Sequence, residues 1–487
     1  MIVAVATEQL HDEAQHLMDS GFVLASMTAH DDGEIFRVVY TFLSGPPDQR
    51  HELVLCIPKG GASIPTLSDL SFPASRFERE IRDLFGIEPV GHNFLRPLVR
   101  HQHWPEDWHP MRRGAGAMPP LREDDVPYPF LEVQGTGVYE IPVGPIHAGL
   151  IEPGHFRFTV VGETILKMTA RLWYLHRGVE RLFEGSTPEQ GIAIAERISG
   201  DSAVAHSLCF VMAVEEALGV DPTEGSLVLR GVLLELERLY NHVSDIGAMC
   251  NDVGFGVVHA RALIVREYIL RLNEAITGHR LLRGALGIGA TSVRRLPSPD
   301  ELDHIEKALD DIVSMAMDNT VLVDRFEGTA RLSLDDAQQL GTLGPVARSS
   351  GIAHDARAAH AFVSSPVFQV ITQETGDVMA RFTQRVEEAQ ISIAMIRDFA
   401  LKTTELSHAS STGNDSPLAG IGVVEGWRGM TVHRVELDSS GLITRCHVID
   451  PSFNNWPAVS ASLANTIVPD FPLANKSFNL SYSANDR

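Results

Sequence analysis

The sequence has 487 residues, of which 44% are hydrophobic and 21% are charged, so it can bury a large core and form more than one domain. Its formal net charge of −23 argues against nucleic acid or anionic lipid as a direct partner, because an acidic surface repels both. The first residues lack the basic start and apolar run of a signal peptide, so we expect no export. No run approaches the ~18 apolar residues that a membrane-spanning helix needs, so membrane association must come through partners.

The four cysteines, Cys56, Cys209, Cys250 and Cys446, are scattered, with no Cys-x-x-Cys pair among them. They predict neither a disulfide framework nor an iron–sulfur or zinc site, and the pattern is typical of a reducing cytoplasm. We expect each to be a buried small side chain rather than a nucleophile.

Residues 1–105 predict a small α+β domain. Short apolar runs such as IFRVVYTFL and HELVLCIPKG are separated by Gly, Pro and Asp clusters, which favours paired strands. Residues 106–137 are rich in Pro, Gly and charge without periodicity and predict an extended linker. The second domain then covers residues 138–487.

The second domain is predicted to be mainly helical with peripheral β-hairpins, so the fold class is α+β. VYEIPVGPIHAG and FRFTVVG alternate like a small antiparallel sheet, and residues 163–183 predict one amphipathic helix that ends at Gly185. Ser186, Pro188 and Glu189 are expected to begin the next helix. Four long helices are expected to form a bundle, with two β-rich segments packed on it. The helices are 202–218, 226–249, 260–277 and 378–399, and the β-rich segments are 422–450 and 475–487.

The segment from Glu78 to Trp108 carries E-R-E-x-x-D-L-F-G-I at 78–87, followed by Gly91-His92 and Leu95-Arg96. On this cluster the first domain resembles the 30-kilodalton subunit of respiratory complex I and the matching domain of formate hydrogenlyase large subunits.

The second domain carries further motifs over most of its length. They are GPIHAGLIEPGHF from Gly144, YLHRGVE from Tyr174, AERISGDSAVAHS from Ala195, ELERLYNH from Glu235, LGPVARSSGIAHDAR from Leu343, GDVMARFTQRVEEA from Gly376 and VEGWRG from Val424. On these motifs it is similar to the 49-kilodalton subunit of complex I and to the large subunit of membrane-bound nickel–iron hydrogenases. The fused order of the two domains is that of formate hydrogenlyase and hydrogenase-4 large subunits.

Hydrogenases of this kind hold nickel and iron with two Cys-x-x-Cys pairs, because soft thiolates suit that metal pair. Aligned on the resemblance, the first pair falls on Ser199 and Ser202, and the second on Ser481 and Ala484. A serine hydroxyl is a far weaker ligand than a thiolate and alanine is none, so we expect no nickel–iron centre and no other cofactor bound by this chain. The end at Arg487, without the extension that such hydrogenases process, agrees with a metal-free subunit.

Complex I uses the same cavity for quinone, with a tyrosine after the motif arginine and a histidine on the preceding hairpin loop. Aligned on Arg197, the tyrosine position is Gly200. His147 matches the first histidine of the complex I pattern, but the quinone-facing position falls near Ile151. Quinone remains a possible ligand only through other cavity residues.

Polar residues of the motifs form the expected cavity lining and candidate site. The candidate proton-relay residues are His147, Glu152, Asp201, His206, Arg348 and Asp355, with Ser199, Ser202, Ser481 and Arg487 beside them. Glu235, Arg238 and His242 share one face of a helix. Such groups either relay protons, since burial shifts their pKa values, or pair with one another to hold the bundle together. Both interpretations stay open.

Two other motifs predict no site. His101, His103 and His109 fall in or beside the linker without a nearby Cys or dense carboxylates, so we expect no metal there. GALGIGAT at 284–291 lacks the spacing of a phosphate loop, so any NAD would bind another subunit.

The resemblance implies a peripheral subunit at the cytoplasmic face of the membrane, held there by partners. These would be an iron–sulfur small subunit like the 20-kilodalton subunit of complex I, carrying its cluster, a ferredoxin-like subunit and antiporter-like membrane subunits. The leading hypothesis is electron transfer coupled to ion translocation. The alternatives are an active hydrogenase or formate hydrogenlyase, a quinone-site subunit of the NADH-quinone type, and a non-catalytic structural subunit.

Overall fold

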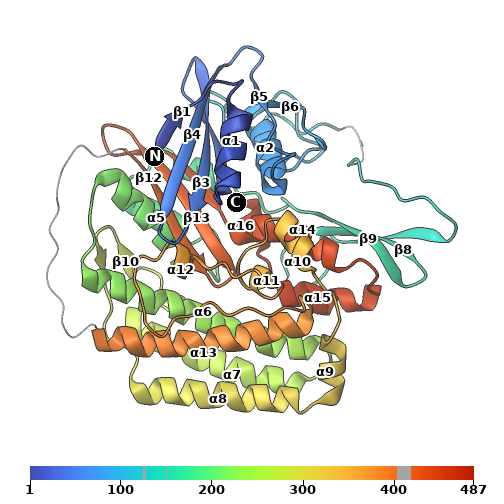
Figure 1. Cartoon of the computed structure of the whole chain (residues 1–487), viewed down its shortest axis with the longest axis vertical. Coiled ribbons are helices and arrows are strands. Elements are labelled where there is room, and N and C mark those ends of the chain that lie inside the picture. The colour runs from blue at the N-terminus through green and yellow to red at the C-terminus, as the bar shows by residue number, and fades with distance from the viewer. Residues whose placement is uncertain (124–127, 150, 403–417) are drawn as a thin grey trace.

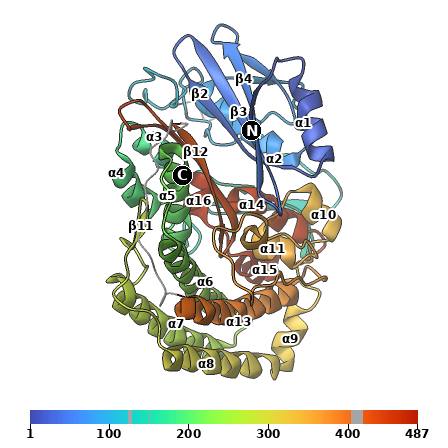
Figure 2. The ribbon, with the colours of Figure 1, turned by 60° about the vertical axis from the view of Figure 1, so that its left-hand side comes forward.

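The computed structural model describes residues 1–123, 128–149, 151–402 and 418–487. Figure 1 shows an N-terminal sheet at one end of the molecule and a bundle of long helices at the other, with a second sheet running between them. The view in Figure 2 has the same order from top to bottom. The predicted α+β class is confirmed.

The N-terminal domain is built on a four-stranded sheet of order β1-β4-β3-β2, in which only β1 and β4 are parallel. Phe36 and every residue from 38 to 43 of β3 are fully buried, as expected for a central strand that is covered on both faces. Helix α2 packs against β2. The bounds are β1 Ile2–Ala4, α1 Leu10–Asp19, β2 Val23–Asp31, β3 Ile35–Ser44, β4 Gln49–Pro58, β5 Ser63–Pro65, α2 Phe72–Phe85 and β6 Glu88–Val90.

The segment after β6 has no helix or strand in its described part, but it is not a free linker. The backbone N–H of buried Met111 donates to the Leu84 carbonyl over 3.2 Å, and Arg112 Nε donates to the Phe85 carbonyl over 2.6 Å. These contacts hold the segment against the end of α2. The expected domain boundaries stay predictions, with β6 ending at Val90 and the next strand beginning at Val138.

A three-stranded antiparallel sheet follows, made of β7 (Val138–Val143), β8 (His155–Val161) and β9 (Thr164–Arg171). It extends away from the body of the molecule in Figure 1. The prediction of one helix over 163–183 is wrong, because Gly162 turns the chain at a φ of 59° and β9 pairs along β8. Only α3 (Val179–Phe183) is helical. The next helix, α4 (Pro188–Ala195), is capped by Thr187 in a capping box with Gln190, one residue later than expected.

The predicted bundle of long helices is present. Helix α6 packs against both α7 and α13, and α8 packs against α7 (Figures 1 and 2). The bounds are α5 Ala203–Leu218, α6 Glu224–Asp252, α7 Gly256–Thr277, α8 Pro299–Met317 and α13 Val378–Lys402. The smaller elements are β10 Leu286–Gly287, β11 Ala290–Thr291, α9 Thr320–Phe326, α10 Leu334–Gln339, α11 Gly344–Arg348 and α12 Ala356–Ala359.

Another three-stranded sheet joins the helices to the N-terminal domain. Its strands are β12 (Ala419–Gly426), β13 (Gly429–Leu437) and β14 (Ile443–Ile449). Strand β12 lies directly on the backbone of α5, since a Cβ at Gly422 would come within 1.8 Å of the Cys209 carbonyl. On the other side, Arg434 Nε donates to Glu52 over 2.6 Å across the domain boundary. The two domains therefore share buried charge pairs as well as apolar surface.

The last residues are helical, so the β-rich segment expected at 475–487 is wrong. The chain ends in α14 (Pro451–Ser462), a short 3₁₀ turn at Val468–Asp470, α15 (Phe471–Phe478) and α16 (Tyr482–Asp486). Asn479 separates the last two helices in a left-handed conformation with φ 43°, which asparagine tolerates well. This break turns the chain back into the interior.

Candidate functional site

The four positions expected to have lost cysteines meet in the interior, where the α4–α5 loop approaches the start of α16. The hydroxyl oxygens of Ser199 and Ser481 are 3.0 Å apart, although 282 residues separate them in sequence. Ser481 also accepts the backbone N–H of Ala484 over 3.0 Å and so caps α16. All three residues and Ser202 are buried. The alignment thus places four residues that the fold does bring together.

An ion pair sits in the same place. Arg428 donates to both carboxylate oxygens of Asp201, over 2.8 and 2.7 Å. Trp427, over which the Arg428 guanidinium lies at 3.9 Å, donates through Nε1 to Ser202 Oγ over 3.1 Å. Burial alone would raise the pKa of Asp201, but Arg428 and the Ser199 hydroxyl outweigh it and lower the pKa to about 2. Asp201 is therefore a fixed anion near neutral pH rather than a proton donor.

A polar cavity of about 640 Å³ opens beside this pair. Of the expected site residues, the cavity is lined by His147, Glu152, Ser199, Asp201 and Ser481. Its other polar lining residues are Asp252, Arg428, Asn475, Lys476, Asn479, Tyr482 and Ser483.

His147 is the cavity group best placed to exchange a proton. Its Nε2 is buried without a hydrogen-bond partner among the described residues, and burial lowers the pKa of the ring, so it is neutral near pH 7. Glu152 instead accepts the backbone N–H of Ser483 over 3.0 Å.

Arg348 and Asp355 do not line this cavity, so the expectation of one shared site is wrong for them. Arg348 is almost fully buried and contacts Glu388 at 2.9 Å, Glu425 at 2.8 Å and Asp355 at 3.2 Å. Glu388 also bonds His242 Nε2 over 3.1 Å. These pairs join α11, α13, β12 and α6 in the core of the second domain.

The α6 residues Glu235, Arg238 and His242 belong to this same buried cluster. Arg238 Nε donates to Glu235 over 3.1 Å, and Glu235 also accepts the Ser392 hydroxyl of α13 over 2.6 Å. Burial raises the pKa of Glu235, but Arg238 and Arg357 outweigh it and lower the pKa. Each of the three side chains has a charged partner, although His242 Nδ1 is buried without a hydrogen bond in the described chain, and this pairing favours the structural interpretation of the face.

His206 and Arg487 also lie outside the cavity lining. His206 bonds His433 over 3.0 Å through Nδ1 and Asp450 over 3.1 Å through Nε2, in a fully buried row. Arg487 pairs with Glu180 of the second domain and with Glu80 of the first. It therefore bridges the two domains.

Family models match two separate parts of the chain. The family model for the 30 Kd subunit of respiratory-chain NADH dehydrogenase matches residues 3–119, and that for the 49 Kd subunit matches residues 252–418. Formate hydrogenlyase subunit 5 of Escherichia coli (strain K12) is 30% identical over 84% of this chain and 74% of its own length. Hydrogenase-4 component G of the same organism is 33% identical over 84% and 73%. The chain belongs to this family of fused large subunits.

Two further relatives extend the likeness. The fused C/D polypeptide of the NADH-quinone oxidoreductase of Phocaeicola vulgatus is 29% identical over 81% of each chain. A chain from the solved structure of the membrane-bound sulfane sulfur reductase, an archaeal respiratory membrane complex, superposes with a TM-score of 0.63. It covers 72% of this chain and 99% of its own, and at 23% identity it shows the shared fold. In the described part of this chain, no helix has the length and apolarity to span a bilayer.

The residues present do not fit the nickel–iron centre of the hydrogenase members of the family. No thiolate is available at Ser199, Ser202, Ser481 or Ala484, and the hydroxyls are already engaged with Asp201, Trp427 and one another. The Arg428 guanidinium would also repel two further cations at short range. In the described ranges, no three His, Cys, Asp or Glu side chains form a group able to hold a metal ion.

The histidines before the second domain have structural contacts. His101 Nε2 bonds the Trp173 carbonyl over 3.1 Å and His109 Nδ1 bonds the Asp83 carbonyl over 3.1 Å. The cysteine expectation is right for Cys209, Cys250 and Cys446, which are buried, and wrong for Cys56, which is exposed.

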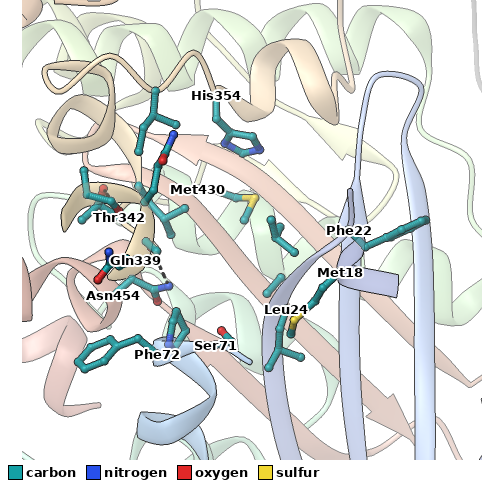
Figure 3. Close-up of a pocket in the computed structure, with 18 of the residues that line it drawn as sticks. Met18, Phe22, Leu24, Ser71, Phe72, Gln339, Thr342, His354, Met430 and Asn454 are labelled. Atoms are coloured by element: carbon teal, nitrogen blue, oxygen red, sulfur yellow. Dashed lines mark hydrogen bonds between the residues drawn. The ribbon is translucent and has the colours of Figure 1, made fainter. Parts of the chain in front are cut away.

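A second cavity, of about 410 Å³, lies between the two domains and contains none of the expected site residues (Figure 3). Its wall is mainly apolar, with Met18, Phe22 and Leu24 on one side and Met430 on the other. His354 is the titratable group among its described lining residues, so these include no carboxylate like those beside Asp201, and burial lowers the pKa of the His354 ring.

The sequence reasoning missed several partners that complete the charged clusters. They are Glu388, Glu425, Trp427, Arg428, His433 and Asp450. Four of them stood inside quoted motifs, GDVMARFTQRVEEA and VEGWRG, and a buried Arg that follows Trp there was the available signal. Nothing in the sequence separated His433 or Asp450 from ordinary strand residues.

Proposed function

We propose that this chain is the large subunit of a membrane-associated complex I-like, hydrogenase-4-like oxidoreductase, which transfers electrons coupled to ion translocation without a nickel–iron centre. The Asp201–Arg428 ion pair, packed against Ser199, Ser202 and Ser481, carries the second half of this proposal. An arginine paired with a carboxylate supplies the local charge balance that a metal centre with thiolates would otherwise provide. No cofactor is assigned to this chain.

The family supports the partners. The chain would dock on an iron–sulfur small subunit like the 20-kilodalton subunit of complex I, which carries the nearest cluster, together with a ferredoxin-like subunit. Antiporter-like membrane subunits would hold it at the cytoplasmic face of the membrane. Relatives named formate hydrogenlyase, hydrogenase-4 and NADH-quinone oxidoreductase subunits, and a neighbour from an archaeal respiratory membrane complex, support such an assembly.

Metal analysis of the purified complex tests the absence of the centre. We expect well under one nickel per large subunit by inductively coupled plasma mass spectrometry, and no hydrogen evolution from reduced viologen. Stoichiometric nickel would overturn the proposal and favour an active hydrogenase or formate hydrogenlyase. A variant with cysteine at Ser199, Ser202, Ser481 and Ala484 is the matched control, since it restores the thiolates while Arg428 remains.

A variant at His147 distinguishes a catalytic cavity from a non-catalytic structural subunit. His147 lines the cavity and its Nε2 makes no hydrogen bond in the described chain, so His147→Gln, which keeps a side chain of similar length beside Phe156, should assemble normally and lower turnover of the complex at least tenfold. His16→Gln on the surface of α1 is the control. If His147→Gln assembles and turns over at the unaltered rate, His147 has no part in turnover, which favours the non-catalytic alternative.

A quinone is the second candidate ligand, and one observation favours it. The rings of His147 and Tyr482 lie 6.4 Å apart at the same cavity, on residues other than those that complex I uses. Burial raises the pKa of Tyr482 to about 12, so its hydroxyl stays protonated and can donate to a carbonyl oxygen. Tyr482→Phe should raise the KM for decylubiquinone, measured as the rate at which the intact complex passes electrons from its iron–sulfur cluster to decylubiquinone. If decylubiquinone accepts no electrons from the intact complex, this candidate is wrong.

A further inference from the structure

A cavity of about 460 Å³ lies at the junction of α2, the segment 94–98, β9 and α14. Five cationic side chains line it, namely Arg76, Arg79, Arg96, Lys167 and Arg171, and no Asp or Glu is among its described lining residues. The chain as a whole has a formal net charge of −23, so a cavity with only positive groups is a local exception. It is separate from the cavity beside Asp201 and shares none of its lining residues.

Arg76 is the centre of this positive charge. Its side chain is only 8% exposed, and its Nε and Nη2 are buried without a hydrogen-bond partner in the part of the chain that the structure describes. Its guanidinium is stacked 4.6 Å from the Phe453 ring and 5.7 Å from the Trp173 ring. Burial and the neighbouring Arg79 lower the pKa of Arg76 to about 9. A buried cation in this state lacks a counter-ion.

Among the described residues, the carboxylate near Arg76 is already engaged. Glu80, one turn further along α2, pairs with Arg487, and no described carboxylate oxygen comes within ion-pair distance of Arg76. Burial raises the pKa of Glu80, and Arg487 opposes that rise. Glu80 therefore leaves the charge of Arg76 uncompensated.

Arg79 and Arg171 are held in place by backbone carbonyls rather than by carboxylates. Arg79 Nε donates to the Arg96 carbonyl over 2.7 Å, and Arg171 Nη2 donates to the Arg100 carbonyl over 2.6 Å. Arg171 is 4% exposed and its Nε has no partner in the described chain. These bonds fix the two guanidinium groups but do not neutralise them, so the site is preorganised for an anion.

The rest of the wall is apolar and aromatic. Phe72, Phe94, Leu131, Met168, Trp173 and Trp456 are among the lining residues. A small inorganic anion would leave this surface without a contact, whereas a molecule with an apolar body would cover it.

We propose that this cavity binds an organic oxyanion, a carboxylate or phosphate ester carried on an apolar body, with Arg76 as its principal charged contact. Arg171 and Arg79, which line the same cavity, add positive charge, and the aromatic wall takes the apolar body. The chemistry is shared by free amphipathic metabolites and by anionic lipids. The inference is independent of the proposed electron-transfer function.

Calorimetry on the purified full-length chain tests the site with octyl phosphate below its micellar concentration as the probe. We expect saturable binding at one site and a rise in the melting temperature. Inorganic phosphate and octanol, which carry only the charge or only the apolar body, should each bind at least tenfold more weakly. Equal binding of inorganic phosphate, or no binding of octyl phosphate, would overturn the proposal.

Variants at Arg76 assign the binding to this cavity. Arg76→Met keeps an unbranched apolar stem against Phe453 and should weaken octyl phosphate binding at least tenfold, while the unliganded melting temperature holds or rises because an unpaired buried charge is gone. Arg76→Lys should bind with intermediate affinity. The control is Arg261→Met on the exposed face of α7, which should bind like the unaltered chain. Unchanged affinity in Arg76→Met would refute the assignment, as would a large fall in its unliganded melting temperature, the sign of a purely structural stack.

Vesicles separate the two sources of such an anion. Phosphatidylcholine vesicles containing phosphatidic acid should compete with octyl phosphate if the ligand is a lipid headgroup with its proximal chain. Competition only by soluble alkyl phosphates assigns the cavity to a free metabolite. Either result supports an organic oxyanion site, and pure phosphatidylcholine vesicles are the control for uptake of octyl phosphate into the bilayer.

Discussion

Replacing Arg428 with Met removes the cation that fixes Asp201 while keeping an apolar side chain over Trp427. The pKa of Asp201 is about 2 beside Arg428, against an ordinary value of 3.8. At about 1.36 kcal/mol per pKa unit the difference corresponds to about 2.5 kcal/mol. The Asp201 side chain is 36% exposed to the cavity, so solvent screening reduces this to about 1 kcal/mol.

Two further contacts are lost with the guanidinium. Arg428 Nε donates to the Asn479 carbonyl over 2.6 Å, a bond worth about 1 kcal/mol, and the contact with the Trp427 ring contributes about 0.5–1 kcal/mol. We therefore expect Arg428→Met to lower the free energy of unfolding by about 3 kcal/mol at pH 7, measured by urea denaturation. Arg261→Met, at an exposed position, should change it by less than about 0.5 kcal/mol.

A double-mutant cycle with Asp201→Asn isolates the ion pair. The coupling energy should be about 1 kcal/mol at pH 7. Because the folded pKa of Asp201 is depressed, its stabilising effect is present above pH 3.8 and is lost as the pH falls towards 2. The cycle should therefore give the same coupling at pH 5 and a smaller one below pH 3.8. A coupling near zero at pH 7, or one that does not shrink in acid, refutes the reasoning.

Three other outcomes are expected. Gly344→Ala should lower the free energy of unfolding by more than about 3 kcal/mol, because its Cβ would lie 2.1 Å from a carbonyl oxygen at a φ of 65°. Gly61 has a φ of 70° and nothing within 4 Å, so Gly61→Ala should lower it by about 1 kcal/mol, with thermal unfolding as the measurement for both variants. Burial raises the pKa of Asp486 to about 6, so the free energy of unfolding should fall as the pH rises from about 4 to 6 and this carboxyl loses its proton. Asp486→Asn should flatten that part of the curve of stability against pH, and an unchanged slope would contradict the prediction. Cys56 should react with Ellman's reagent in the native chain while the buried thiols Cys209, Cys250 and Cys446 react only after denaturation, and rapid release of all four would contradict the described burial.

Much of the fold followed from periodicity. The long bundle helices have apolar residues at helical spacing over several turns, and α6, α7 and α13 were placed within a few residues of their ends. The prediction of a helix over 163–183 was wrong because TILKMTAR mixes good helix formers with two threonines, and only its pairing with β8 makes it a strand. The prediction of β structure for the C-terminal segment was wrong because α15 and α16 are short helices separated by an asparagine in a left-handed conformation.

The site was predicted in part. The alignment placed Ser199 and Ser481 together, since a shared fold keeps motif positions even when their chemistry is lost. The sequence could not show that Arg348 and Asp355 lie outside the cavity, because the family motifs supply residues to the buried core as well as to the cavity wall. Which charges pair is a property of packing, so partners such as Glu388 and Asp450 became visible only in three dimensions.

The pairing of Arg434 with Glu52 has a consequence for how the chain is made. The two residues are 382 positions apart, and translation at 5–20 residues per second leaves Glu52 without this partner for roughly 20–75 s. During that interval the N-terminal sheet exposes the surface that β13 will cover, with its carboxylates still hydrated. Completion of the domain junction must therefore await synthesis of β13, so a ribosome stalled before that strand should carry an N-terminal unit whose junction face is open to proteases and chaperones.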